Sequence, residues 1–273
     1  MTALSPVTDS GVTWHRPARY EVAPLLELDP DLGRALTDRR RLAAQAAVPV
    51  RVLALGRGPW DAERFGTVAA AHIGVLIVDG LVGRELLADD VASMELLGPG
   101  DILRPWDEAA ESELLRAVVR WSALAPSRLA LLDHQLAVRL AGYPEIYSVL
   151  LERFAIRTRR LAMLQAISQF NRVDRRILTL FWHLAERWGR VTPDGVLLPL
   201  ALSHRMLGQL VGARRPTVSG ALAELSRAGE VLRGDAGTWL LTGTPVATPD
   251  AQVSQFVAPR RAVLPLSTKM RAR

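Results

Sequence analysis

Residues 202–231 read LSHRMLGQLVGARRPTVSGALAELSRAGEV, and this stretch decides how the C-terminal part of the chain folds. Ser203 is placed to cap a helix of about two turns whose apolar residues recur on one face. Gly212 follows that helix and permits the left-handed backbone of a tight turn. Pro216 then suits the first turn of a second helix, which continues to about Arg227. The stretch therefore predicts two short helices that meet at a corner, a helix-turn-helix.

The second predicted helix is apolar on one face and polar or small on the other. Its inward face is formed, at i, i+3, i+4 and i+7 spacing, by Val218, Ala221, Leu222 and Leu225. Its N-terminal end carries arginines that can make paired hydrogen bonds to guanine, together with small hydroxyls. Arg215 is the first candidate for such a base contact. The predicted DNA-binding set is Ser203, Arg205, Arg214, Arg215, Thr217, Ser219, Gly220 and Arg233.

A hairpin is predicted directly after these helices. Residues 231–241 read VLRGDAGTWLL, in which two short apolar runs flank a turn with Gly234 and Gly237. A hairpin at this place is the wing of a winged helix-turn-helix.

Residues 48–103 have a different texture, with short apolar or alternating runs broken by glycine and proline. They predict a small antiparallel β-roll or barrel, whose strands we expect to stop after Pro105 and Trp106. Helical periodicity is expected from Asp29–Pro30 to about Ala47, and again over residues 112–121 and 129–141.

A long helix is predicted over residues 145–170, which contain no glycine or proline. Its two apolar stripes are Leu150, Phe154, Leu161 and Leu164, and Val149, Ile156, Met163 and Ile167. One stripe can face its own domain and the other a second subunit, so we expect a homodimer. A further helix over residues 171–188 is expected to end at Gly189.

The net charge of +6 lies wholly in the last 75 residues, so the C-terminal part suits a polyanionic partner. The chain has no cysteine, which excludes disulfides and thiolate metal sites. No signal peptide or long apolar run is apparent, which predicts a cytoplasmic protein without a membrane partner.

The order of sheet domain, long helix, helix-turn-helix and wing resembles the Crp/Fnr family of transcription regulators over about residues 25–243. The matching features of the helix-turn-helix are Ser203, Gly208, Gly212, Arg215, Thr217, Val218 and Leu222, and the turn LGPGDIL at residues 97–103 resembles the family's sheet domain. The resemblance implies an α+β fold with a jelly-roll-like N-terminal β-roll, a dimerisation helix and a winged helix-turn-helix. It also implies sequence-specific binding of double-stranded DNA by a homodimer at a near-palindromic site, with RNA polymerase as a further candidate partner.

The predicted division of the chain follows from this order. It comprises a flexible N-terminus (residues 1–24), a β-roll effector-like domain (25–142), a dimerisation helix (143–170), a winged helix-turn-helix DNA-binding domain (171–244) and a basic disordered tail (245–273).

Two departures from the family pattern limit what the resemblance implies. Arg214, Pro216 and Gly220 stand where other members carry a capping hydroxyl, an acidic base contact and a second arginine, so base preference cannot be carried over. The cassette that holds a cyclic nucleotide is also missing: Glu108 and Arg116 could be considered for its roles, but the Ala- and Glu-rich stretch between them is predicted as helix and not as a phosphate cradle. We therefore expect no cofactor and a degenerate or non-cyclic-nucleotide effector pocket, whose ligand the sequence does not identify.

Three other classes of protein compete with a ligand-controlled regulator of this kind. An enzyme is not predicted, because no phosphate loop, paired-histidine zinc helix or serine nucleophile elbow is present. The five scattered histidines are His15, His72, His134, His183 and His204, and they form no metal-ligand pattern. A sensor of the same fold would bind haem, with His72 or His134 as an axial ligand, or another small molecule. A constitutive or architectural DNA-binding protein would have no effector.

Overall fold

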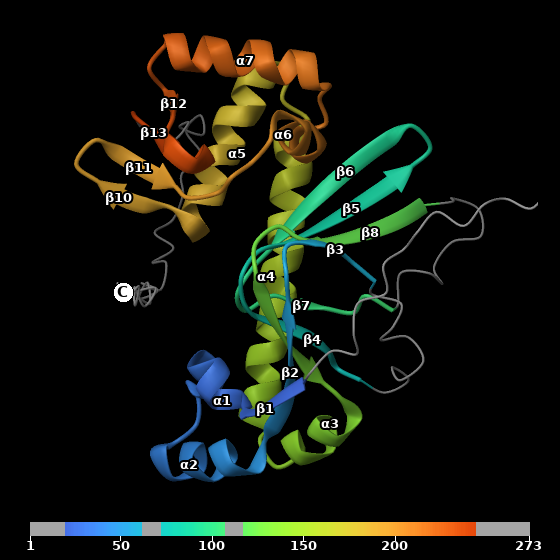
Figure 1. Ribbon diagram of the computed structural model, residues 1–273. Coiled ribbons are helices and arrows are strands. Elements are labelled where there is room, and N and C mark those ends of the chain that lie inside the picture. The colour runs from blue at the N-terminus through green and yellow to red at the C-terminus, as the bar shows by residue number, and fades with distance from the viewer. Residues whose placement is uncertain (1–19, 62–71, 107–116, 244–273) are drawn as a thin grey trace, which may run out of the picture.

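The computed structural model describes residues 20–61, 72–106 and 117–243 (Figure 1). The helices are α1 (Leu25–Leu28), α2 (Asp38–Ala47), α3 (His134–Leu140), α4 (Pro144–Ser168), α5 (Val173–Trp188), α6 (His204–Val211) and α7 (Arg215–Arg227), with short 3-10 helices at Pro30–Gly33 and Asp235–Gly237. The strands are β1 (Tyr20–Pro24), β2 (Pro49–Leu55), β3 (Gly58–Trp60), β4 (Gly74–Asp79), β5 (Val82–Ala88), β6 (Val91–Leu97), β7 (Ile102–Leu103), β8 (Ala117–Ala123), β9 (Ser127–Leu132), β10 (Arg190–Thr192), β11 (Gly195–Leu198), β12 (Val231–Arg233) and β13 (Trp239–Leu241).

The N-terminal domain is built from two antiparallel sheets. One has the strand order β1-β2-β9-β4-β7, and the other has the order β3-β8-β5-β6. The predicted α+β class, with antiparallel sheets, a long helix and a C-terminal helix-turn-helix, is confirmed. The inner sides of the two sheets share an apolar cluster that includes Ile77, Val82, Leu97 and Leu129.

The 25-residue helix α4 runs along the middle of the molecule and connects the sheet domain with the C-terminal domain (Figure 1). Its first turns bury Ile146, Val149 and Leu150 against the first sheet, α1 and α2. At its far end, Ile167 enters the core of the C-terminal domain. The two predicted stripes are therefore partly used within the chain, while Leu161 and Met163 stay exposed.

The predicted helix over residues 112–121 is wrong in its described part, and the predicted helix over residues 129–141 is wrong up to residue 132 but confirmed over His134–Leu140. Residues 117–123 form β8 and residues 127–132 form β9, and a helix begins only at His134. Strand β9 pairs with both β2 and β4, so it is central, and residues 129–132 are all buried. A continuous apolar run of this length fits a strand buried on both faces as well as a helix. Residues 112–116, which include Arg116, lie outside the described residues, as does Glu108.

The predicted helix from Asp29–Pro30 to Ala47 is also divided differently. Pro30–Gly33 form a 3-10 helix, and α2 begins only at Asp38. The Asp29 side chain makes no capping hydrogen bond at this point. Its carboxylate instead accepts hydrogen bonds from Arg153 on α4. A contact 124 residues away thus replaces the predicted cap.

The N-terminal boundary requires a correction as well. The sequence places Tyr20–Pro24 within a flexible N-terminus, but these residues form β1 and pair in antiparallel register with Pro49–Leu53 of β2. The rest of that segment (residues 1–19) and the whole predicted basic tail (245–273) lie outside the described residues. Within the described chain, no helix is long and apolar enough to span a membrane.

Candidate DNA interface

The first helix of the helix-turn-helix is formed as its sequence predicts. The Ser203 hydroxyl accepts a hydrogen bond from the Met206 backbone N–H at 3.2 Å and caps α6. Gly212 ends the helix in the left-handed conformation, with φ of 65°. Position 208 also requires glycine, because a Cβ there would lie 2.4 Å from the Ala213 carbonyl oxygen. The two glycines allow the chain to turn sharply and return close to α6.

Helix α7 then buries its apolar face against α5 and α6. The buried residues are Val218, Ala221, Leu222 and Leu225, as predicted. Arg214, Arg215, Thr217 and Gly220 are exposed near the N-terminal end. Arg214 occupies the N-cap position but makes no capping hydrogen bond, so its guanidinium is not used to hold the helix. The space around Gly220 is open, since a Cβ there would meet no atom within 4 Å.

Ser219 differs from these exposed residues because its hydroxyl is already engaged. It donates to the Arg215 carbonyl oxygen at 3.1 Å, and it lies 2.8 Å from His204 Nδ1. Both contacts are satisfied together when the His204 Nδ1–H donates to Ser219. The hydroxyl therefore fixes α7 to the start of α6, and a base contact would have to replace one of these bonds.

His204 was not identified from the sequence as a site residue. Burial lowers its pKa first, and the positive charges of Arg233 and Arg215 lower the pKa further. The same charges show that the ring lies within the electrostatic reach of both α7 and the wing. The only sequence signal that His204 connects α6 to α7 is its position directly after the capping Ser203.

The wing is part of a larger sheet than expected. The predicted strands β12 and β13 are present, and β13 also pairs with β11 in the order β10-β11-β13-β12. Strands β10 and β11 were not predicted. Arg233 is exposed on β12, with its guanidinium carbon 5.3 Å from the centre of the Trp239 ring. Trp239 packs in turn on Phe181 of α5, which anchors the wing to the core.

Arg205 differs from the other predicted DNA-binding residues because it contacts the sheet domain. Its guanidinium forms an ion pair with Glu85 of β5 at 3.2 Å, and so it faces the sheet domain. The same carboxylate oxygen accepts a hydrogen bond from Gln209. Neither Glu85 nor Gln209 was identified from the sequence, because their contact joins residues 124 positions apart.

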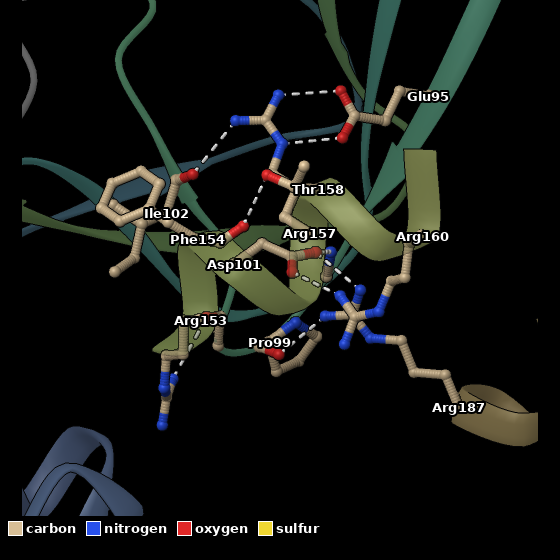
Figure 2. A network of polar contacts seen from close by, with 12 residues as sticks. Glu95, Pro99, Asp101, Ile102, Arg153, Phe154, Arg157, Thr158, Arg160 and Arg187 are labelled. Carbon is tan, nitrogen blue, oxygen red and sulfur yellow. Dashed lines mark hydrogen bonds and ion pairs between the residues drawn. The ribbon is translucent and has the colours of Figure 1, made fainter. Parts of the chain in front are cut away.

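The turn between β6 and β7 fixes the orientation of the C-terminal domain. Figure 2 shows Asp101 of this turn between α4 and α5. Its Oδ1 accepts from Arg160 of α4 at 2.7 Å, and its Oδ2 accepts from Arg187 of α5 at 2.6 Å and from the Gly98 backbone N–H at 2.8 Å. The carboxylate is 4% exposed, so these partners replace nearly all of its water. One buried carboxylate thereby joins the sheet domain, the long helix α4 and helix α5 of the C-terminal domain.

Other arginines fix α4 to the sheet domain alone. Arg157 makes two hydrogen bonds to the buried carboxylate of Glu95, at 2.7 and 2.8 Å (Figure 2). Arg153, which is 5% exposed, contacts Asp29, Asp31 and the Gly100 carbonyl oxygen. These bonds determine how α4 lies on the sheets, whereas Asp101 also determines how α5 lies.

The two histidines considered as haem ligands are close in space. His72 Nδ1 accepts a hydrogen bond from the His134 backbone N–H at 3.2 Å. The rings of His72 and Trp106 are nearly perpendicular, and their centres are 5.9 Å apart. Burial lowers the pKa of His72. Among the described residues, no three histidine, aspartate or glutamate side chains gather as a metal site.

Comparisons with known proteins agree with this arrangement. Residues 172–241 match the Crp-like helix-turn-helix domain. The regulatory protein CysR of Synechococcus elongatus is 29% identical over 152 residues, which cover 54% of this chain and 64% of CysR. The match thus spans less than two thirds of that relative.

Two solved structures are similar over most of their length. A cyclic nucleotide-binding domain containing protein from Listeria monocytogenes EGD-e has a TM-score of 0.59 at 17% identity, covering 78% of this chain and 97% of that chain. A CooA mutant from Carboxydothermus hydrogenoformans has a TM-score of 0.56 at 18% identity, covering 71% of this chain and 84% of that chain. These findings confirm the predicted resemblance in the helix-turn-helix, where residues 172–241 match the Crp-like domain, and the fold of the described chain is similar to that of the two solved structures.

Proposed function

We propose that this protein is a transcription regulator of Crp/Fnr type that binds double-stranded DNA in a sequence-specific manner as a homodimer. The observation that carries the proposal is the exposed N-terminal end of α7, held at a fixed angle to α6 by Gly212. A helix presented in this way enters the major groove with its first residues against the base edges. Arg215 is the residue that we assign to a paired contact with guanine.

The neighbouring residues suit contacts with the DNA backbone. Arg214 and Thr217 are exposed beside Arg215, and Arg233 lies on the wing at the edge of the same surface. Phosphate contacts position a protein on DNA, while base contacts provide specificity. Gly220 leaves room for the DNA to approach α7 closely.

The homodimer is proposed from the uncovered side of α4. An exposed stripe of small or apolar residues runs along it, formed by Leu151, Ala155, Ala162 and Ala166. At 3.6 residues per turn, their spacing of i, i+4, i+11 and i+15 keeps them within about 60° on one face of the helix. Two copies of α4 packed along this stripe would carry two α7 helices, which can read half-sites one DNA turn apart, about 34 Å.

The proposal includes no enzymatic activity, and it places the protein in the cytoplasm with RNA polymerase as a candidate partner. For the effector, we propose a ligand other than a cyclic nucleotide. The β6–β7 turn supports this, because its only carboxylate, Asp101, is already bound by Arg160 and Arg187 and is not available to a ligand.

Binding of the purified protein to its own upstream DNA, compared with a scrambled duplex, tests the proposal. Fluorescence anisotropy at physiological salt should show preference for the upstream DNA, and Arg215→Ala should reduce that preference by about five- to hundredfold, the range for one paired base contact. Arg227→Ala is the matched control, since Arg227 lies on the same helix at its other end. Equal affinity for both duplexes, followed by no enrichment in a random-sequence selection, would instead indicate an architectural DNA-binding protein.

A further inference from the structure

Glu85 connects the sheet domain to the first helix of the helix-turn-helix. It lies on β5, and one of its carboxylate oxygens accepts hydrogen bonds from both Arg205 and Gln209 of α6. The β5–β6 hairpin extends beside α6, and β6 is in contact with that helix (Figure 1). A single acidic residue of one domain therefore binds two polar residues of the other.

The exposure of the partners is unequal. The Glu85 side chain is 15% exposed, whereas the Arg205 side chain is 70% exposed. Leu81, Met94 and Leu124 of the sheet domain pack against the core of the C-terminal domain, as does Met206 of α6, and Met94 lies opposite Glu85 in the register of β5 and β6. The carboxylate is thus held in place by its surroundings, while the guanidinium can rotate away to another anion.

A carboxylate and a phosphate oxygen offer the same type of acceptor to a guanidinium. In a helix-turn-helix, the first helix crosses the DNA backbone, so α6 is the helix that meets phosphates. We propose that Arg205 and Gln209 form a binding site for a DNA phosphate, and that Glu85 occupies this site as an internal competitor when DNA is absent. This inference rests on the proposed DNA binding, and it adds Gln209 to the residues that contact the backbone.

Release of α6 does not leave Glu85 without a cation. Arg120 lies directly opposite Glu85 in the register of β5 and β8, on the same face of the sheet. Side chains paired in this way are about 4.5–5.5 Å apart at their Cβ atoms, within reach of an ion pair. On DNA, Arg205 exchanges Glu85 for a phosphate and Arg120 takes the place of Arg205 at Glu85, so neither charged group is left unpaired.

The glutamine variant Glu85→Gln tests the competition, since it keeps the shape of the side chain and removes its charge. We expect its affinity for a duplex of any sequence to rise about two- to fivefold, the effect of one partly exposed ion pair. Arg205→Gln alone should weaken binding and reduce the slope of log K against log salt by about 0.9, because one phosphate contact is lost. In the double variant, the gain from Glu85→Gln should disappear, since the competitor no longer has a cation to withhold.

Asp90→Asn is the matched control, because Asp90 is exposed in the turn between β5 and β6 and carries the same charge. It should leave affinity unchanged if the effect of Glu85 arises from its contact with α6. An equal gain in Asp90→Asn, or a gain from Glu85→Gln that persists without Arg205, would overturn the proposal in favour of general charge repulsion. Unchanged affinity in Glu85→Gln would also overturn it. A wild-type protein that binds no DNA would refute the proposed function itself, which distinguishes the two failures.

Discussion

The substitution Asp101→Asn should destabilise the protein strongly, because it removes the charge on which two arginines converge. The new amide would also turn its NH2 group toward guanidinium N–H groups, so that donors would meet donors. Breaking a buried ion pair by removing one partner costs about 3–5 kcal/mol. Arg160 and Arg187 keep 27% and 14% of their side-chain exposure, so water partly solvates them once they are released.

These exposures place the expected loss at the lower end of that range, about 3 kcal/mol. For a chain of this length, the loss corresponds to a decrease in Tm of about 6–12 °C. Urea unfolding followed by tryptophan fluorescence measures it, and Trp188, which packs on Gly98 beside the site, is a local reporter.

The exposed pair between Asp79 and Arg128 provides the control for Asp101→Asn. Both of its side chains are 44% exposed, so Asp79→Asn should cost at most about 1 kcal/mol. Two outcomes would refute the argument that burial makes the Asp101 carboxylate essential to the contact between the sheet domain, α4 and α5. One is an equal loss of unfolding free energy in both variants, and the other is a loss below about 0.5 kcal/mol in Asp101→Asn.

Three further predictions concern single positions. Gly208→Val should destabilise the C-terminal domain by about 2–3 kcal/mol in urea unfolding, because its Cβ would lie 2.4 Å from the Ala213 carbonyl oxygen; an unchanged midpoint would contradict this close approach. Burial keeps the pKa of His183 below its usual 6.5, so the unfolded chain binds more protons as pH falls through 6.5 and the free energy of unfolding should decrease there. His183→Asn should reduce that decrease between about pH 7.5 and about pH 5.5, and an identical pH profile would exclude His183 as a cause. Ala162→Glu on the exposed stripe of α4 should shift the mass in light scattering from a dimer to the 29.9 kDa monomer, whereas Leu42→Glu, at an exposed position on α2, should not.

The helix-turn-helix could be predicted closely because its determinants are local. Ser203 caps α6 through a backbone N–H that lies only a few residues further along the chain, Gly212 turns the chain by its own conformational freedom, and Pro216 begins α7. Each of these effects depends on a few neighbouring residues. The element bounds could therefore be obtained without knowledge of the rest of the chain.

The strands β8 and β9 could not be distinguished from helices by the same means. Residues 129–132 are buried on both faces because Leu129 and Leu131 pack in the cluster between the two sheets, while Ala130 and Leu132 pack in the cluster with α1, α2 and α4. The pairing of β9 with β2 and β4 joins segments about 50–80 positions apart in the chain. The alternation that identifies a half-exposed strand is absent from such a segment. Strand β8 was not predicted for a related reason, since its residues also fit the helical periodicity expected over residues 112–121.

The charge of the candidate DNA interface could also be predicted only in part, because the sequence does not show which arginines are paired. The sequence places Arg205 in a basic segment, and by composition alone it is as available to DNA as Arg214 or Arg215. In the folded chain, Glu85 already binds Arg205, whereas Arg214 and Arg215 are exposed at the start of α7. Because the pairing of an arginine depends on which acid the fold brings to it, net charge indicates that a domain suits DNA but not which of its cations are free to bind. In the proposed regulator, the contact of Arg205 with Glu85 is therefore one point, besides the contacts of Asp101, at which the state of the sheet domain can influence DNA binding.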